Sequence, residues 1–230
     1  MDSITEHIKT HYDHPIIGVI GSTLPRHPYQ KAMGERAGFL LRQYIADRGT
    51  LFTGGVEGVG VDVHRGLAQY CLEHEGAIPP EKFFVLVPTH TISPKESYQP
   101  QPYTIPNEYL ATHTSLSMLP LSIEHAGAHM GERRHYVGQV ADLLVCLNGG
   151  RGTVDEAITG LSNNVPVIAL PATGGAAQTL LAFRHPHYGD IHREQASKMS
   201  IDVSSANFDL LHQATLDDLE ETVEGVLSAR

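Results

Sequence analysis

Residues that can bind an anion and do acid–base chemistry lie close together in the middle of the chain. Arg133 and Arg134 precede an apolar segment at residues 143–147, the glycine-rich sequence Gly149-Gly-Arg-Gly-Thr153 follows it, and Glu156 comes about one helical turn later. Glycines let the backbone turn sharply and expose its amides to a ligand. The first amides and the dipole of a following helix favour an anion such as phosphate. The stretch therefore predicts an anion site beside a carboxylate and two guanidinium groups.

Three secondary-structure elements must position these groups. The continuous apolar run Leu143–Leu147 indicates a parallel strand that is covered on both faces. Thr153 suits the N-cap of a helix that continues to about Leu161. A helix from about Leu116 through Met130 is expected to lead into the two arginines.

The same residues also have purely structural interpretations. An acid in the first turn of a helix complements the helix dipole, and neighbouring arginines commonly form a solvated helical face. Asp155 carries the same charge as Glu156 but points about 100° away around the helix, so only one of the two can face a pocket. We predict that this residue is Glu156.

The two motifs together resemble the signature of a known enzyme family. Met130-Gly-Glu-Arg-Arg134, followed at this distance by Gly149-Gly-Arg-Gly-Thr-Val-Asp-Glu156, is similar to the pattern of the Lonely Guy family. These enzymes are nucleoside 5′-monophosphate phosphoribohydrolases in the wider nucleotide-binding group called SLOG. The resemblance covers roughly residues 15–183. Arg134 stands where the family usually has lysine, and Asn148 stands where it usually has proline.

The resemblance implies hydrolysis of the N-glycosidic bond of a nucleoside 5′-monophosphate to free base and ribose 5-phosphate, without a cofactor. Such a reaction passes through an oxocarbenium-like sugar, which needs a carboxylate near the anomeric carbon. Glu156 and Arg133 fall on the family's catalytic glutamate and arginine. Whether Glu156 acts as nucleophile or as base stays open, as does the identity of the base that is released.

Substrate-binding residues are expected in three loops that follow strands, and in the arginine pair. The first strand, Ile16–Ile20, ends in Gly-Ser-Thr, where ligand contacts are common in parallel sheets. A second strand at 51–52 leads into a glycine-rich turn. The alternative interpretation is that this turn has no ligand and only packs the following helix against the sheet. The expected binding residues are Gly21, Ser22, Gly54, Gly55, Arg134, Gly149, Gly150, Arg151, Gly152 and Thr153.

Composition limits the partners. The chain has 230 residues, of which 41% are hydrophobic, enough for one domain with a sizeable core. Its net charge of −10 argues against a general affinity for nucleic-acid backbones. Cys71 and Cys146 suit buried free thiols in a reducing compartment. No apolar run approaches the roughly 20 residues that span a bilayer, and the first residues lack the features of a signal peptide. We expect a cytoplasmic protein without nucleic-acid or membrane partners.

The order of elements predicts an α/β fold. Apolar runs at 83–87 and 165–170 add further strands, and strand–helix alternation indicates a doubly wound, mostly parallel, Rossmann-like sheet flanked by helices on both faces. One domain over residues 1–230 is expected. It comprises an N-terminal arm at 1–14, a long loop at 89–115 and a C-terminal extension at 184–230. The loop is interpreted as a lid or an interface loop. The extension is expected to hold a possible strand at 201–203 and a terminal amphipathic helix.

Other chemistries are less well supported. His125 and His129 lie four residues apart on the expected helix, the spacing of a zinc pair, but no third ligand follows at a recognised spacing, so we predict no metal. Ser22 lacks a Gly-x-Ser-x-Gly context, and no Gly-x-Gly-x-x-Gly follows the first strand, which argues against an NAD dehydrogenase. The apolar content of Leu116–Met130 exceeds that of one helix face, and related enzymes pair near the active site, so a homodimer is expected.

The alternative function is a non-catalytic SLOG sensor that binds a nucleotide or a nucleotide-derived signal. Retention of both Arg133 and Glu156 favours the enzyme, because a binding protein has no need of the glutamate. The unusual second glycine loop and the long segment at 89–115 point towards a different ligand.

Overall fold

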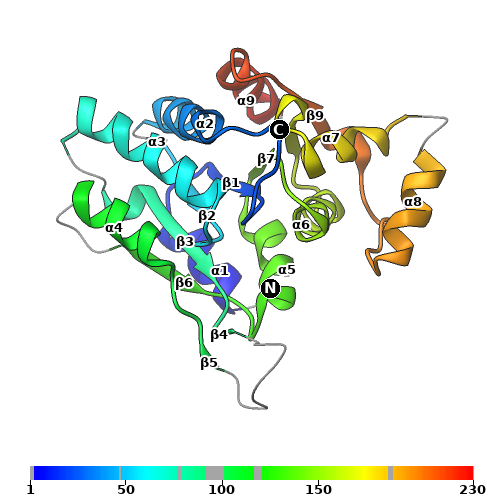
Figure 1. Ribbon diagram of the computed structural model, residues 1–230, viewed down its shortest axis with the longest axis horizontal. Helices are drawn as coiled ribbons and strands as arrows, with labels where there is room; N and C mark the ends of the chain where they lie inside the picture. The colour runs from blue at the N-terminus through cyan, green and yellow to red at the C-terminus, as the bar shows by residue number, and fades with distance from the viewer. Residues whose placement is uncertain are drawn as a thin grey trace.

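A seven-stranded parallel sheet forms the centre of the computed structural model (Figure 1). The structure describes residues 3–46, 48–76, 79–91, 101–116, 121–185 and 189–229. The strand order is β6-β3-β2-β1-β7-β8-β9, and every neighbouring pair is parallel. The strands are β1 (Ile16–Gly21), β2 (Thr50–Thr53), β3 (Phe83–Val87), β6 (Ser122–His125), β7 (Leu143–Leu147), β8 (Val167–Leu170) and β9 (Leu211–Gln213). The predicted fold class is confirmed.

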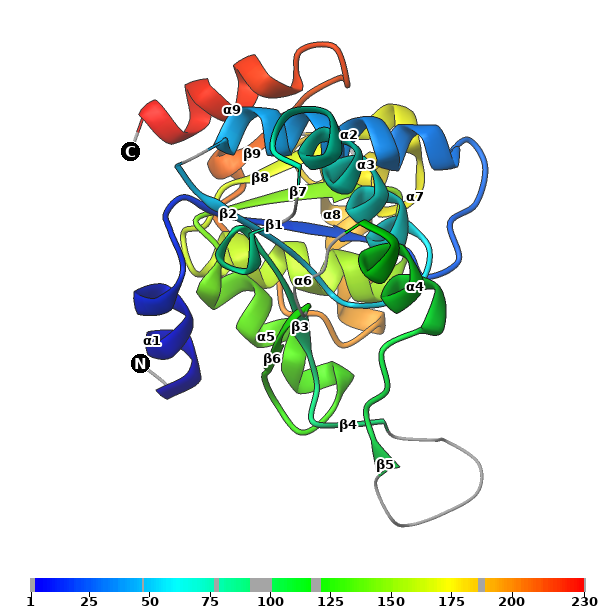
Figure 2. The ribbon, with the colours of Figure 1, turned by 90° about the vertical axis from the view of Figure 1, so that its left-hand side faces the viewer.

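Helices cover both faces of the sheet, as Figure 2 shows. One layer contains α2 (Lys31–Ile45), α3 (Val59–His74), α4 (Asn107–Leu116) and α9 (Leu219–Ser228). The other contains α1 (Ser3–His11), α5 (Met130–Val140), α6 (Arg151–Ser162), α7 (Gly175–Ala182) and α8 (Gly189–Lys198). Alternate residues of a strand face opposite layers, so Val145 packs with the first layer and Leu144 with the second. Both faces of the sheet are therefore buried, as the apolar run at β7 predicts.

The sheet reverses its direction of winding between β1 and β7. From β1 the chain passes to β2 and β3 on one side, and later crosses back to place β7 on the other side. In open parallel sheets, ligands bind outside the carboxyl ends of the strands at such a switch point. The loops that follow β1 and β7 carry Ser22 and the sequence Gly149–Thr153, so the expected phosphate loop lies at this position.

The expected continuous helix from Leu116 to Met130 is wrong. Helix α4 ends at Leu116, strand β6 follows, and α5 starts only at Met130; residues 117–120 lie outside the described part of the chain. Gly127 has a φ of +74°, which no helix continues through, and His129 then caps α5. Some apolar residues of this region therefore belong to an edge strand and not to a helix. The homodimer was inferred from the apolar content of that helix, so it loses this argument and stays a prediction.

The segment at 89–115 also differs from a long loop. Its described residues form an antiparallel pair, β4 (His90–Thr91) and β5 (Gln101–Pro102), and helix α4; residues 92–100 lie outside the described residues. Tyr109 of α4 is buried, stacks on His64 of α3 and shares a hydrogen bond of 2.7 Å with Thr53. Helix α4, which forms the C-terminal part of this segment, is thus docked onto α3.

The C-terminal extension contributes to the sheet. No strand forms at 201–203; instead β9 pairs with β8 and extends the sheet by one strand. The predicted terminal amphipathic helix is confirmed as α9, whose buried residues face α2. Cys71 and Cys146 are buried free thiols. Within the described residues, no helix has the length and apolar character needed to cross a membrane.

Helices α5 and α6 carry the two candidate catalytic residues and cross at two glycines. A Cβ on Gly138 would lie 2.5 Å from the backbone nitrogen of Gly160, and backbone atoms cannot move aside as a flexible side chain can. The absence of a side chain at Gly138 therefore sets how closely the two helices approach.

We expect Gly138→Ala to destabilise the fold by about 1–3 kcal/mol because overpacking separates the two helices. Gly225→Ala on α9 is the matched control, since a Cβ there meets nothing within 4 Å; it should stabilise by up to about 1 kcal/mol through helix propensity. Urea denaturation measures both free energies of unfolding. Equal effects of the two substitutions would contradict the close crossing.

Candidate active site

A cavity of about 290 Å³ opens at the carboxyl ends of β1, β2 and β7. Five parts of the chain line it: β1 and its loop, β2 and its loop, the start of α3, α5 as far as Val137, and the start of α6. Nine of the predicted site residues line this cavity: Gly21, Ser22, Gly54, Arg133, Arg134, Gly150, Gly152, Thr153 and Glu156. The structure thus brings the two motifs of the sequence together around one space.

A buried ion pair between Arg133 and Glu156 is the central feature of the cavity. The guanidinium Nη2 donates to Oε1 of Glu156 at 2.5 Å, and the residues are 6% and 5% exposed. Nε of Arg133 is buried without a hydrogen-bond partner among the described residues. Burial raises the pKa of the Glu156 carboxyl, and the adjacent guanidinium groups of Arg133 and Arg134 oppose that shift. An orphaned donor and a desolvated carboxylate in one cavity are typical of a functional site.

The side chains of Asp155 and Glu156 point in different directions from α6, as the helix geometry predicts. Glu156 faces the cavity, whereas Asp155 is half-buried beside it and pairs with Arg134 at 3.7 Å. That pair is partly solvated, so it contributes little to stability. Asp155 therefore offers a matched control for any substitution of Glu156.

The glycine-rich sequence expected to bind phosphate lies at the amino end of α6. Gly149 has a φ of +102°, a conformation that a residue with a side chain rarely adopts, and a Cβ there would lie 2.6 Å from Thr153. Gly152 gives the Arg134 guanidinium room, because a Cβ would lie 2.8 Å from its Nη2. The first amides of α6 and a guanidinium group thus border the same cavity, which suits a phosphate.

Four of the predicted site residues differ in place or role from the prediction. Thr153 is not the N-cap of α6: Gly150 holds that position, and the Thr153 hydroxyl donates to the Gly21 carbonyl at 3.1 Å. The helix starts earlier because the glycine turn is complete at Gly150. Gly55, Gly149 and Arg151 are not among the residues that line the cavity. The Gly55 carbonyl accepts from the Tyr103 hydroxyl at 3.1 Å, and the Arg151 side chain is exposed.

The expected histidine pair does not share a helix. His125 ends β6, and His129 caps α5 by accepting from the amides of Gly131 and Glu132 at 3.1 and 3.3 Å. Within the part of the chain that the structure describes, no three histidine, cysteine, aspartate or glutamate residues are grouped to hold a metal ion. The absence of a metal requirement stays a prediction.

Sequence reasoning missed the apolar wall of the cavity and the residue that braces it. Phe52, Val56 and Met130 are apolar residues that line the cavity. Phe52 lies near the end of β2, just before a glycine-rich loop. This position in the sequence could have identified it as a residue that lines the cavity. Asn148 hydrogen-bonds to two other loops, and nothing local in the sequence indicates this.

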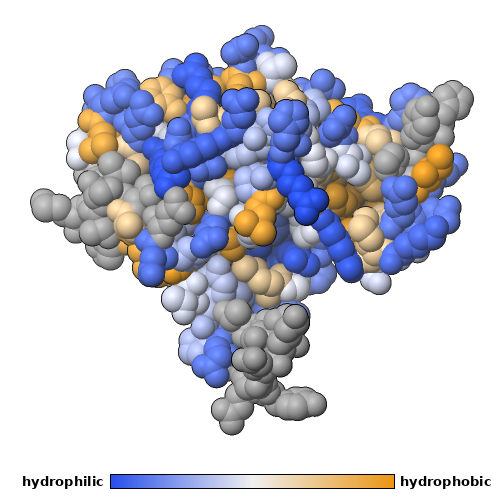
Figure 3. All heavy atoms as spheres, in the orientation of Figure 1, coloured by the Kyte–Doolittle hydropathy of each residue, from blue (hydrophilic) through white to orange (hydrophobic). Residues whose placement is uncertain are grey.

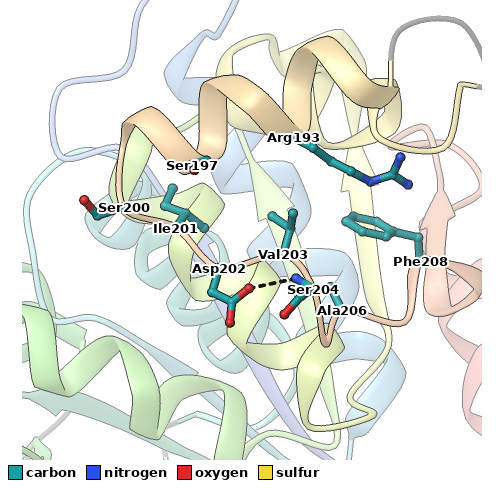
Figure 4. A pocket seen from close by; sticks show the side chains of 9 residues that line it. All are labelled: Arg193, Ser197, Ser200, Ile201, Asp202, Val203, Ser204, Ala206 and Phe208. Atoms are coloured by element: carbon teal, nitrogen blue, oxygen red, sulfur yellow. Dashed lines mark hydrogen bonds between the residues drawn. The ribbon is translucent and has the colours of Figure 1, made fainter.

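A larger hollow of about 640 Å³ lies between α8 and the segment at 201–208 (Figure 4). Its cation, Arg193, already pairs with Asp190 at 3.1 Å, and the Asp202 carboxylate accepts from the Ser204 amide at 2.9 Å. The segment is joined to the end of α6 that is remote from Glu156, through Asn207. Charges in this hollow are satisfied locally, so it is a weaker candidate than the smaller cavity.

The outer surface offers few further clues. Figure 3 shows one face on which the coloured residues are mainly hydrophilic and apolar residues form small separate spots. The exposed large hydrophobic residues within the described ranges are scattered over five elements or loops: Leu24, Leu72, Leu110, Ile123 and Ile191. The cavity at the switch point therefore remains the best candidate site.

Comparison with known proteins supports the fold. No protein-family model matches the sequence, and no curated protein matches it. Solved structures that align with nearly the whole chain include the following three. TM1055 has 19% identity and a TM-score of 0.54, covering 91% of this chain and 98% of its own. The molybdenum cofactor carrier protein MCP from Chlamydomonas reinhardtii has 19% identity and a TM-score of 0.51, covering 93% and 98%. The molybdenum cofactor binding protein from the phototrophic bacterium Rippkaea orientalis has 17% identity and a TM-score of 0.54, covering 93% and 97%. At these identities the likeness shows the shared α/β fold alone.

The ion pair itself can be tested through stability. We expect Arg133→Met to lower the free energy of unfolding by about 3–5 kcal/mol at neutral pH, because it leaves a buried carboxylate without a partner. The pKa of Glu156 in the folded state should then rise further. As the pH falls from this raised pKa towards the pKa of Glu156 in the unfolded chain, the folded state binds an extra proton and the loss of unfolding free energy becomes smaller. Urea denaturation across this pH range measures the effect.

The double variant Arg133→Met with Glu156→Leu is the control. It removes both charges. Because replacing a whole buried ion pair by apolar residues is often neutral, the double variant should be more stable than Arg133→Met by about 3–5 kcal/mol at neutral pH. If the single variant is as stable as the parent at every pH, the pair is not buried as described.

Proposed function

We propose that this protein hydrolyses the N-glycosidic bond of a nucleoside 5′-monophosphate to free base and ribose 5-phosphate. The observation that carries the proposal is the buried Arg133–Glu156 pair in a cavity that also receives the first amides of α6. Water supplies the hydroxyl that replaces the base at the anomeric carbon, and its proton balances the departing base. The resemblance of both motifs to the Lonely Guy signature supports this assignment.

Glu156 is the group that stabilises the reacting sugar in this proposal. As the C–N bond breaks, positive charge develops on the anomeric carbon and ring oxygen, and a carboxylate in a water-poor cavity stabilises it strongly. The same carboxylate can orient a water as base or attack the anomeric carbon as nucleophile. Both routes need Glu156 ionised, and Arg133 favours that state.

The phosphate loop supplies orientation. The amides at the start of α6, its dipole, and the guanidinium of Arg134 bind the 5′-phosphate one helical turn from Glu156. Binding energy from a group that does not react then holds the anomeric carbon in place, which raises the rate and not only the affinity. The base would lie against the apolar wall that includes Phe52 and Val56.

A binding role without catalysis is the second candidate. Two of the structural neighbours are named as a carrier and a binding protein of the molybdenum cofactor. In this interpretation the cavity holds a phosphorylated ligand, and Glu156 serves only as the partner of Arg133. The two candidates differ in one respect, which is whether a bound nucleotide loses its base.

Chromatography of a nucleoside-monophosphate panel after incubation with the protein tests the proposal. Purine and pyrimidine 5′-monophosphates are incubated beside the corresponding nucleosides, and free base and ribose 5-phosphate are quantified. The proposal requires equal amounts of both products from at least one monophosphate and none from its nucleoside. Tight binding of a monophosphate without release of base would favour the binding role.

Glu156→Gln should lower the turnover of the active monophosphate by roughly a hundredfold or more, because it removes the charge while keeping the shape. Its affinity for the monophosphate, measured by calorimetry, should change only a few-fold. Asp155→Asn is the matched control, since it neutralises the adjacent carboxylate outside the cavity, and it should keep turnover within a few-fold. A Glu156→Gln enzyme as fast as the parent would refute the catalytic assignment.

The pH dependence of kcat/KM should show an acid limb from Glu156. Burial raises the pKa of this carboxyl, so the active carboxylate is lost on acidification at a pH above the ordinary glutamate value of about 4.3. The substrate phosphate, with a pKa of about 6, adds a limb of its own. Only the Glu156 limb should vanish from the residual activity of Glu156→Gln; if both limbs persist, another group titrates.

A further inference from the structure

We infer that Asn148 is a positioning residue that locks the two walls of the cavity together. Its side chain is buried, and its backbone φ is +50°. Nδ2 donates to the carbonyl of Arg26 at 3.1 Å and to that of Thr173 at 2.6 Å, while Oδ1 accepts from the Arg26 amide at 3.4 Å. The Asn148 amide in turn donates to the Thr173 hydroxyl at 2.7 Å. One side chain therefore joins three loops at the carboxyl edge of the sheet.

These three loops follow neighbouring strands. Arg26 lies in the loop after β1, whose earlier residues Ser22 and Thr23 form one wall of the cavity. Asn148 directly precedes the glycine loop after β7, whose Gly150 forms a second wall of the cavity. Thr173 ends the short 3₁₀ helix Pro171–Thr173 after β8. The Asn148 contacts thus fix the spacing between the walls from outside the cavity.

Helix α7 completes the brace. The amides of Ala177 and Ala176 donate to the carbonyls of Asn148 and Gly149 at 3.1 and 2.9 Å. Both carbonyls are therefore turned towards the start of α7 and away from the site of an anion. This orientation leaves the amides at the start of α6 available for a phosphate, without a carbonyl oxygen to repel it.

The position demands asparagine for physical reasons. Proline, which the resembling family usually carries here, holds φ near about −65° and cannot adopt the value of +50°. Asparagine tolerates the left-handed region better than most residues and has both a donor and an acceptor to offer. The start of the loop after β1 is held by the hydrogen bond from the Thr153 hydroxyl to the Gly21 carbonyl. Its far end is held by the hydrogen bonds between Asn148 and Arg26.

If the hydrogen bonds of the Asn148 side chain are removed, we expect the loops after β1 and β7 to be less well ordered before a ligand binds. Loops held in the bound conformation save the free energy of ordering them on binding. The effect on catalysis rests on the proposed function, whereas the effect on loop order does not. Ribose 5-phosphate is the probe, because it carries the phosphate and the sugar and cannot be hydrolysed at a glycosidic bond.

The experiment compares Asn148→Gly and Asn148→Asp with the parent. Glycine keeps the backbone conformation and removes all side-chain bonds, while aspartate sets carboxylate oxygens against two carbonyls. Asn164→Gly is the matched control, because Asn164 also has a positive φ, of +58°, but lies beyond the opposite end of α6. Calorimetry gives the affinity for ribose 5-phosphate, and hydrogen exchange gives the protection of residues 22–28 and 149–153.

Both Asn148 variants should bind ribose 5-phosphate at least tenfold more weakly, with faster exchange in both loops and the larger loss for Asn148→Asp. Asn164→Gly should match the parent in affinity and in exchange of these loops. Folded Asn148 variants with parental affinity and exchange would overturn the inference, even if their melting temperatures fell. Failure of the proposed function appears instead in the parent, as nucleotide that never releases its base.

Discussion

The buried charge pair of Arg133 and Glu156 is the constraint on which the rest of the site depends. A carboxylate that is almost fully removed from water is costly unless a cation and hydrogen bonds compensate it. Here one guanidinium does so at 2.5 Å, and its Nε still lacks a partner among the described residues. Such a pair contributes little net stability. Its cost is better explained by a ligand that engages the two groups than by a need to hold the fold together.

The fold makes this pair possible by bringing two helix starts to one edge of the sheet. Helices α5 and α6 flank β7, and their close crossing at Gly138 and Gly160 sets the distance between the residues one turn into each. The reversal of winding between β1 and β7 leaves a space at that edge for a ligand. Helix α7 and Asn148 then hold the glycine loop with the carbonyls of Asn148 and Gly149 turned towards α7. The charge pair, the glycine loop and the cavity therefore follow from one arrangement of strands.

The parts of this arrangement that depend on local pattern were predictable from the sequence. The run Leu143–Leu147 indicates a buried strand because every position is apolar, and the two motifs together assign Glu156 and Arg133 to one site. Their ion pair was not predicted. Strands β6 and β9 were not predictable, because Ser122–His125 and Leu211–Gln213 are short, partly polar and held by pairing with distant strands. The same holds for Asn148, whose partners lie 122 and 25 residues away. The cap of α6 was misplaced by three residues because glycine, and not threonine, completes the turn.

The most direct test of the account is a crystal structure of the Glu156→Gln variant with a nucleoside 5′-monophosphate bound. The account expects the phosphate on the amides of residues 150–152 beside Arg134, and the anomeric carbon facing the side chain at position 156. The base should then contact Phe52 and its apolar neighbours. A phosphate bound elsewhere, such as the hollow beside α8, or an anomeric carbon turned away from position 156, would contradict the account.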